Sequence, residues 1–263
     1  MKLEFVKLSP TENMTVIVKT PVPRSEHSRV AAALIGYAGV FAEQAGFVEP
    51  PAIEGAGSRL QMMGGEFCGN ATMSMAALTA RDEGIMPGET RMIPVEISGA
   101  NELLYCSVTS TEEGFICRTR MPLPESVEEM NGFVLVRMPG IAHVILKCSE
   151  PEKMRAGAEE LLRETAENLP DEAVGLMLYS PEKAELIPLV YVKPTDTMIW
   201  ERGCGSGSAA VGAMTAWERQ QSAAVRLKQP GGVINVNAGW NEGVIGLSIE
   251  GKVKIVCEGY AYV

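Results

Sequence analysis

The chain has 263 residues, of which 46% are hydrophobic and 21% charged, a composition typical of a folded globular protein. Its formal net charge of −10 argues against binding to nucleic acid or to an anionic membrane surface. The opening residues 1–10 lack the apolar stretch of a signal peptide, and no segment approaches the ~20 apolar residues of a membrane span. We therefore expect a cytoplasmic protein whose partner is a small molecule, with no nucleic-acid partner and no membrane.

The hydrophobic pattern predicts an α/β fold in which strands outnumber helices. Strands are predicted, in chain order, over residues 2–8, 14–19, 58–63, 90–97, 103–109, 114–120, 133–138, 142–147, 174–179, 184–192, 224–229, 233–237, 243–250 and 253–263. Helices are predicted over residues 28–45, 73–81, 151–168 and 209–219. The Pro- and Glu-rich segment 122–131 has little periodicity and is the candidate linker between two domains.

A repeat at about half the chain length is the most informative feature. Residues 67–80 (FCGNATMSMAALTA) align without a gap with residues 203–216 (GCGSGSAAVGAMTA). The two segments share Cys-Gly and, nine residues later, Ala-(Leu/Met)-Thr-Ala. Self-similarity at a fixed offset indicates a duplicated structural unit. We therefore expect two similar domains, each of a usual domain size.

Each copy of the repeat places a cysteine, Cys68 or Cys204, at or just before a helix N-terminus. The free N–H groups and positive dipole end there favour a thiolate and offer donors to a ligand carboxylate. Two equivalent thiols suit a reaction in which one removes the α-proton of an amino acid and the other returns a proton to the opposite face. Without an electron-sink cofactor the carbanion needs electrostatic stabilisation, which two helix N-termini would supply.

Other features give weaker indications. Only two histidines occur, and no CxxC or HxxxH spacing supports a zinc site. The glycines of residues 205–210 fit a loose dinucleotide pattern, but the acidic residue expected about 20 positions later is missing. All six cysteines are expected to be reduced thiols. Four of them lie in apolar strand-like segments and are predicted to be core residues: Cys106, Cys117, Cys148 and Cys257.

The two cysteine motifs resemble the superfamily of diaminopimelate epimerases and proline racemases. Residues 66–70 (EFCGN) are similar to the CGN motif of the epimerases, and residues 204–207 (CGSG) are similar to its CGSG partner. Glu201 and Arg202 are similar to the acidic residue and arginine that precede the second cysteine of proline racemases. The resemblance covers nearly the whole chain.

The resemblance implies a diaminopimelate epimerase-like fold of two similar domains, each a curled mixed β-sheet around a central helix. The N-terminal domain would contain residues 1–122 with a returning last strand, 252–263, and would carry Cys68. The C-terminal domain would contain residues 123–251 and carry Cys204. The resemblance further implies a homodimer and no need for pyridoxal phosphate, a metal or any other cofactor.

The resemblance also assigns the site residues. Cys68 and Cys204 would be the acid/base pair. Substrate contacts are expected from eight residues, of which four would hold the α-carboxylate through their backbone amides and the rest would contact the substrate through their side chains: Gly69, Asn70, Gly205 and Ser206, then Asn13, Gln61, Glu201 and Arg202. His143 is interpreted either as a core histidine or as a residue of the site wall.

Departures from the epimerase pattern bear on the substrate. Residues 140–143 (GIAH) stand where diaminopimelate epimerases carry GNPH, and Ala173 stands where they carry asparagine. A site that loses the hydrogen-bonding partners of a distal substrate group loses selectivity for that group. Residues 12–15 and 62–70 are similar to the histidine racemases of this superfamily, including those that feed opine-metallophore synthesis, so histidine is the expected substrate.

Several alternatives stay open. The chain could be a diaminopimelate epimerase, another amino-acid racemase or epimerase, or a hydroxyproline epimerase or dehydratase-type isomerase. A non-catalytic amino-acid-binding protein, or a redox switch in which Cys68 and Cys204 form a disulfide, is the alternative of a different class.

Overall fold

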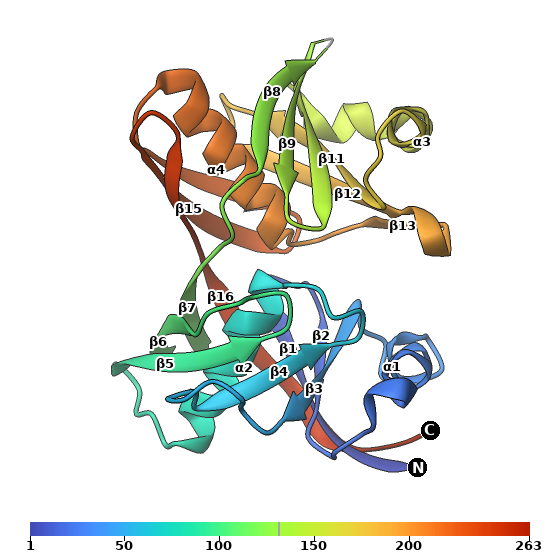
Figure 1. The fold of residues 1–263 in the computed structure, drawn as a ribbon, viewed down its shortest axis with the longest axis vertical. Coiled ribbons are helices and arrows are strands. Elements are labelled where there is room, and N and C mark those ends of the chain that lie inside the picture. The colour runs from blue at the N-terminus through green and yellow to red at the C-terminus, as the bar shows by residue number, and fades with distance from the viewer. Residues whose placement is uncertain (131) are drawn as a thin grey trace. The chain divides into compact units, whose positions relative to one another are not determined.

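The computed structural model describes residues 1–130 and 132–263. The chain divides into two compact units, of which the first contains Met1–Arg120 and Glu250–Val263 and the second contains Met121–Ile249 (Figure 1). None of the helices in the described ranges is long and apolar enough to cross a membrane.

The first unit is a curled mixed sheet with one helix packed inside it. Its strands are β1 (Lys2–Pro10), β2 (Thr15–Val18), β3 (Gln44–Glu49), β4 (Ser58–Met62), β5 (Thr90–Ile97), β6 (Leu104–Thr111), β7 (Gly114–Arg120) and the last part of β16 (Val244–Tyr262). Its helical segments are η1 (Arg24–Glu26), α1 (His27–Ile35) and α2 (Gly69–Asp82). Helix α2 is buried on all sides from Gly69 to Leu78 and packs against β1, β2 and β4–β7. Its small and apolar residues fit that position, because a helix without a polar face must lie in a core.

The second unit has the same plan around helix α4 (Gly205–Arg219), which is also buried around its circumference. Its strands are β8 (Ser126–Met130), β9 (Phe133–Met138), β10 (Ile141–Lys147), β11 (Ala173–Ser180), β12 (Glu185–Val192), β13 (Thr197–Trp200), β14 (Ala223–Gln229), β15 (Gly232–Trp240) and the first part of β16. Its other helical segments are η2 (Pro151–Arg155), α3 (Ala158–Glu167) and η3 (Lys193–Thr195). A Cβ on Gly212 would lie 2.4 Å from Val236 Cγ1, so the glycine allows α4 to approach β15 closely.

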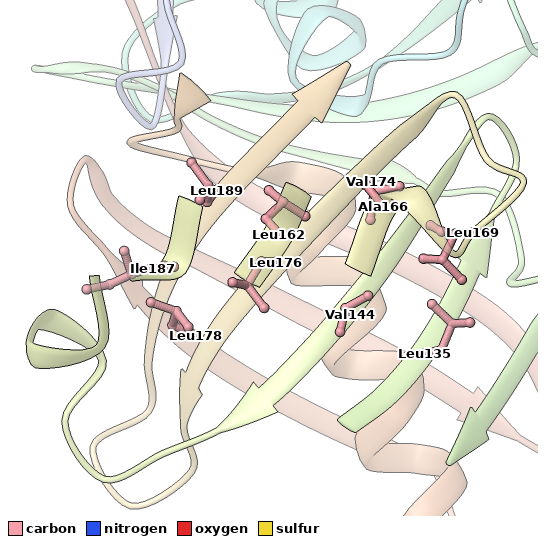
Figure 2. Close-up of a cluster of buried hydrophobic side chains, with 12 residues drawn as sticks. Leu135, Val144, Leu162, Ala166, Leu169, Val174, Leu176, Leu178, Ile187 and Leu189 are labelled. Atoms are coloured by element: carbon pink, nitrogen blue, oxygen red, sulfur yellow. The ribbon is translucent and has the colours of Figure 1, made fainter. Parts of the chain in front are cut away.

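Helix α3 covers a hydrophobic cluster in the second unit. Leu162 and Ala166 of α3 point toward Leu176 and Val174 of β11 and toward Leu189 of β12 (Figure 2). These side chains are almost completely buried. Burial of each valine or leucine side chain contributes roughly 1.5–3 kcal/mol of transfer free energy. The cluster therefore fixes the strands on which the site residues of this unit lie.

The strand pairings repeat between the units and confirm the duplication. In the first unit β1–β2 is antiparallel, β2–β3 parallel, β3–β4 antiparallel, β4–β5 parallel and β5–β6 antiparallel. In the second unit β9–β10, β10–β11, β11–β12, β12–β14 and β14–β15 follow the same series. Helices α1 and α3 occupy equivalent connections, as do α2 and α4. The predicted fold class is therefore confirmed.

One predicted helix is wrong over much of its length. The helix expected over 28–45 ends at Ile35, and residues from Gln44 form β3. Gly36 takes an extended conformation (ψ 163°) and stops the helix. The last carbonyls of α1 are then capped by the returning chain, because Val40 N bonds Leu34 O and Ala42 N bonds Ile35 O.

Other boundaries also differ from the predictions. The helix expected over 151–168 is two segments, η2 and α3, separated by Gly157 at φ +84°. The expected linker 122–131 contains β8, a polar strand that pairs with β9, while Asn131 lies outside the described residues. The two strands expected over 243–263 form the single strand β16, and β13 was not predicted. Cys257, predicted to lie in the core, is exposed on β16.

Candidate active site

Cys68 is the N-cap residue of α2. Its extended backbone (φ −138°, ψ 112°) leads into the helix, and its sulfur accepts a hydrogen bond from Ala71 N at 3.4 Å. The first intrahelical bond runs from Thr72 N to Cys68 O. A sulfur at this position lies where the helix N-terminus favours negative charge, as the sequence predicts.

A chain of side-chain hydrogen bonds ends at the Cys68 thiol. Cys68 Sγ donates to Gln44 Oε1 at 3.1 Å, and Gln44 Nε2 donates to Asn13 Oδ1 at 2.7 Å and to Thr15 Oγ1 at 2.8 Å. Asn13 Nδ2 donates to Glu43 Oε2 at 2.6 Å. Because the Glu43 carboxylate only accepts, it fixes the orientation of both amides and turns Gln44 Oε1 toward the sulfur.

Gln44 was not predicted from the sequence, and the side-chain amide of Asn13 is hydrogen-bonded within the protein. Asn13 is buried, and its amide is engaged by Glu43 and Gln44. Gln44 lies at the first position of β3, within the segment that the sequence pattern predicts as helix. Glu12, just before Asn13, holds φ +59°, a left-handed conformation that a non-glycine residue adopts only when its surroundings enforce it.

Cys204 is the N-cap residue of α4 and repeats the geometry of Cys68. Its sulfur accepts a hydrogen bond from Gly207 N at 3.2 Å and lies 3.6 Å from Ser206 Oγ. A Cβ on Gly207 would lie 2.3 Å from Met177 Sδ and 3.0 Å from Cys204 Sγ. A side chain at position 207 would therefore force the thioether of Met177 or the sulfur of Cys204 to move.

Gln229 holds the backbone of Cys204 and was also missed. Its Oε1 accepts from Cys204 N at 2.8 Å, and its Nε2 donates to Ser208 Oγ at 2.7 Å. Ser208 Oγ in turn donates to Cys204 O. Gln229 is buried at the end of β14, on the same face as Ala223 and Leu227, and a polar residue at a buried position of an alternating strand was the available signal.

Glu201 is the acidic neighbour of Cys204. Burial and the adjacent Glu201 carboxylate raise the pKa of the Cys204 thiol well above its usual value, and the thiol donates a hydrogen bond to that carboxylate. The Ser206 hydroxyl and Gly207 N–H act in the opposite direction. Burial also raises the pKa of Glu201. Cys204 is therefore a neutral thiol beside a group that can accept its proton.

The four residues predicted to bind the α-carboxylate lie on the same segments as the two cysteines. Gly69 and Asn70 form the first turn of α2, and Gly205 and Ser206 form the first turn of α4. Within the described residues, no acceptor is found for the N–H groups of Gly205 and Ser206. These N–H groups can bind an anion such as a carboxylate.

Gln61 and Arg202, the other two predicted substrate contacts, lie outside the first turns of α2 and α4. Gln61 lies on β4 before the turn that leads to Cys68, and its Nε2 lies 3.3 Å from Met62 O. Arg202 Nη2 donates to Pro230 O at 3.2 Å, while Arg202 O accepts from Gly231 N. The second contact ties the segment before Cys204 to the turn after Gln229.

His143 lies in the interior of the second unit. It is fully buried on β10, and its ring packs on Gly175, where a Cβ would lie 2.5 Å from Nδ1. Burial lowers its pKa to about 3, so the ring is neutral. Neither ring nitrogen has a hydrogen-bond partner among the residues that the structure describes. Those residues also contain no group of three or more His, Cys, Asp or Glu side chains arranged to hold a metal ion.

Comparisons with known proteins address the family of the chain. The family model described as the histidine racemase CntK N-terminal domain matches residues 2–262. A histidine racemase of Fusobacterium nucleatum subsp. nucleatum is 30% identical over 273 residues, covering 99% of this chain and 97% of that protein. Both comparisons extend over nearly the whole chain.

Solved structures share the fold at low identity. A phenazine biosynthesis protein of the PhzF family from Bacillus anthracis has a TM-score of 0.75 and 16% identity, covering all of both chains. A hydroxyproline epimerase from Agrobacterium vitis, with bound trans-4-hydroxy-L-proline, has a TM-score of 0.69 and 11% identity, covering 98% of this chain and 92% of that one.

Proposed function

Because this chain belongs to the family of the histidine racemase CntK N-terminal domain, we propose that it interconverts L- and D-histidine with Cys68 and Cys204 as its two bases. Membership makes the chain an isomerase of the amino-acid racemase and epimerase type. The observation that carries the two-base proposal is the matched geometry of the two sulfurs. Each belongs to the N-cap residue of a buried helix and accepts the N–H of the residue three positions later.

The chemistry follows from this geometry. One cysteine, as a thiolate, takes the α-proton of histidine, and the electron pair left on Cα is delocalised into the carboxylate. The other cysteine, as a thiol, delivers its proton to the opposite face of Cα and becomes the thiolate. The atoms balance, since one proton leaves and one arrives, and the reverse reaction exchanges the two roles. Amides of Gly69, Asn70, Gly205 and Ser206 would stabilise the charge that develops on the carboxylate.

The neighbours of the two sulfurs would set the proton positions. Glu201 is placed to receive the Cys204 proton and so to generate the thiolate when substrate enters. Gln44 Oε1 accepts from Cys68 and would hold that sulfur in its protonated form until it is needed. Asn13 would then act on the substrate site through Gln44 rather than by direct contact.

We further propose that no pyridoxal phosphate and no metal takes part. The role of an electron sink would fall to the two helix N-termini, which supply fixed dipoles rather than a conjugated ring. Activity of protein treated exhaustively with a chelator, without added pyridoxal phosphate, should equal that of untreated protein. A loss that is restored by a metal or by the cofactor would contradict this part of the proposal.

The direct test is isotope exchange. Reduced protein is incubated in deuterated water with L-histidine, while proton NMR follows the α-proton and chiral chromatography follows the enantiomers. We expect loss of the α-proton signal together with formation of D-histidine. Parallel samples contain diaminopimelate, hydroxyproline and other L-amino acids. Exchange confined to one of those would keep the two-base mechanism and change the substrate, whereas no exchange with any would exclude the racemase proposal.

The homodimer expected from the family resemblance stays a prediction. Analytical ultracentrifugation of the reduced protein at several concentrations measures it directly, and a sedimentation coefficient of the monomer at all concentrations would contradict it.

A further inference from the structure

The second unit has a cavity at the C-terminal end of α4, the end opposite to Cys204. Its volume is about 370 Å³, and its wall includes Val127, Glu125, Trp217, Gln220, Trp240 and Glu242. Trp217 lies 13 residues after Cys204 along the helix, which corresponds to roughly 20 Å of helix axis. The cavity is therefore separate from the proposed catalytic sulfur of this unit. The elements that contribute lining residues, β8, α4 and β15, are labelled in Figure 1.

Two of the three tryptophans of the chain line this cavity. Trp217 and Trp240 are both partly exposed. Within the described residues, neither indole N–H has a hydrogen-bond partner in the structure. Tryptophan offers a large apolar face of negative electrostatic potential, and it is the best of the aromatic side chains for contact with a cation. Two aromatic residues of this kind therefore border the cavity.

The charged side chains that line the cavity are all negative. Glu125 and Glu242 line it, and neither carboxylate forms an ion pair or a hydrogen bond with a described residue. By contrast, Glu218, exposed on the same helix as Trp217, pairs with Lys147. No lysine or arginine is among the described residues of the cavity wall. Glu242 also holds φ +55°, so the tight turn after β15 fixes the position of its backbone.

We propose that this cavity binds a small organic cation, with a quaternary or N-methylated ammonium group lying on the indole of Trp217 or Trp240. Glu125 and Glu242 supply the opposite charge. The volume falls within the usual range for small-molecule sites, and the combination of aromatic faces with carboxylates is the one that recognises ammonium groups that cannot donate hydrogen bonds. An anion of the same size would be repelled by the two carboxylates.

The test uses choline as the cation and 3,3-dimethylbutan-1-ol, its uncharged analogue, as the matched ligand. A Trp200→Phe variant leaves Trp217 and Trp240 as the only fluorescent indoles, since Trp200 lies on β13 with its Nε1 bonded to Glu159. We expect saturable quenching by choline, with a Kd on the order of millimolar, and no saturable quenching by the alcohol.

Two further variants test whether Glu125 and Glu242 supply the negative charge that attracts the cation. The double variant Glu125→Gln/Glu242→Gln should weaken choline binding about tenfold, whereas Glu218→Gln, the control on the same helix, should leave it unchanged. Saturating L-histidine should not displace choline. Equal binding of the alcohol, no saturation with choline, an equal effect of Glu218→Gln, or displacement by histidine would each overturn the proposal. Because none of these measurements uses racemase activity, its failure is distinguishable from failure of the proposed function.

Discussion

Gln44 Oε1 accepts the hydrogen bond of the Cys68 thiol at 3.1 Å, whereas the corresponding partner of Cys204 is the carboxylate of Glu201. The duplication therefore gives the two cysteines the same helix position and different neighbours. An amide oxygen can hold a proton on sulfur but cannot take it, while a carboxylate can do both. The asymmetry lets one sulfur lose its proton to a neighbour while the other keeps its own.

Removal of the Gln44 acceptor should slow the reaction without preventing folding. We expect Gln44→Leu to lower kcat/KM for L-histidine by about tenfold, because the lost hydrogen bond is worth about 1 kcal/mol and the sulfur loses its orientation. Gln44→Glu should be slower still, since a carboxylate there opposes thiolate formation and cannot donate to Asn13. Steady-state polarimetry measures both, with circular dichroism as the folding control. Wild-type activity in both variants would exclude a role for Gln44.

The fold was predictable to the extent that it depends on local pattern. The Cys-Gly repeat and the helices that follow it are encoded within 14 contiguous residues, so the N-cap positions of Cys68 and Cys204 could be predicted from the chain. The end of α1 at Ile35 could not, because it depends on the return of residues 40–42 to cap the helix. The apolar and small residues that follow Ile35 continue a helical pattern although the chain leaves the helix at that point.

The supporting residues of the site were less predictable than the sulfurs. Gln44 and Gln229 lie 24 and 25 residues from the cysteines they contact, so the contacts cannot be predicted from the sequence around either cysteine. The family resemblance predicts Asn13 as a substrate ligand, and the structure adds that its amide bonds Glu43 and Gln44. Side chains that orient a reactive group are brought to it by the sheet, so only the folded structure identifies them.

Both sulfurs should be necessary for racemisation. We expect Cys68→Ala and Cys204→Ala each to abolish formation of D-histidine while leaving the melting temperature within a few degrees of that of the wild type, because each removes one of two bases. Cys257→Ala is the matched control, since Cys257 is exposed on β16 and should be fully active. Chiral chromatography measures the product. Racemisation by either single variant would contradict the two-base scheme.

Loss of the charge on Glu201 should make Cys204 easier to ionise. The Glu201 carboxylate raises the pKa of the Cys204 thiol by repelling the thiolate and by accepting its hydrogen bond. In a Cys68→Ala background, Glu201→Gln should therefore shift the pH profile of Cys204 alkylation by iodoacetamide to lower pH. Mass spectrometry of the modified peptide measures the rate. An unchanged profile, or a shift to higher pH, would contradict the effect of the carboxylate charge on this thiol.

The buried His143 should make the stability of the protein decrease in acid. Its folded-state pKa is about 3, far below the 6.5 of an exposed histidine, so the unfolded chain binds a proton that the native protein does not. The contribution of His143 is therefore fully present above about pH 6.5 and is lost as the pH falls from 6.5 toward 3. At pH 5 the loss is about 2 kcal/mol.

The comparison of two histidine variants isolates this contribution. In His143→Leu the free energy of unfolding in urea should fall less between pH 7 and pH 5 than in the wild type, by about 2 kcal/mol. His27→Gln is the control, since His27 is the other histidine of the chain and its Nε2 lies 3.0 Å from Val22 O. Because the leucine side chain that replaces the ring would pack against Gly175 and Met177, the variant is expected to fold. If the free energy of unfolding of the wild type and of His143→Leu fell in parallel with pH, His143 would have the same pKa in the folded and unfolded chain. The folded chain would then have to supply a partner for the protonated ring.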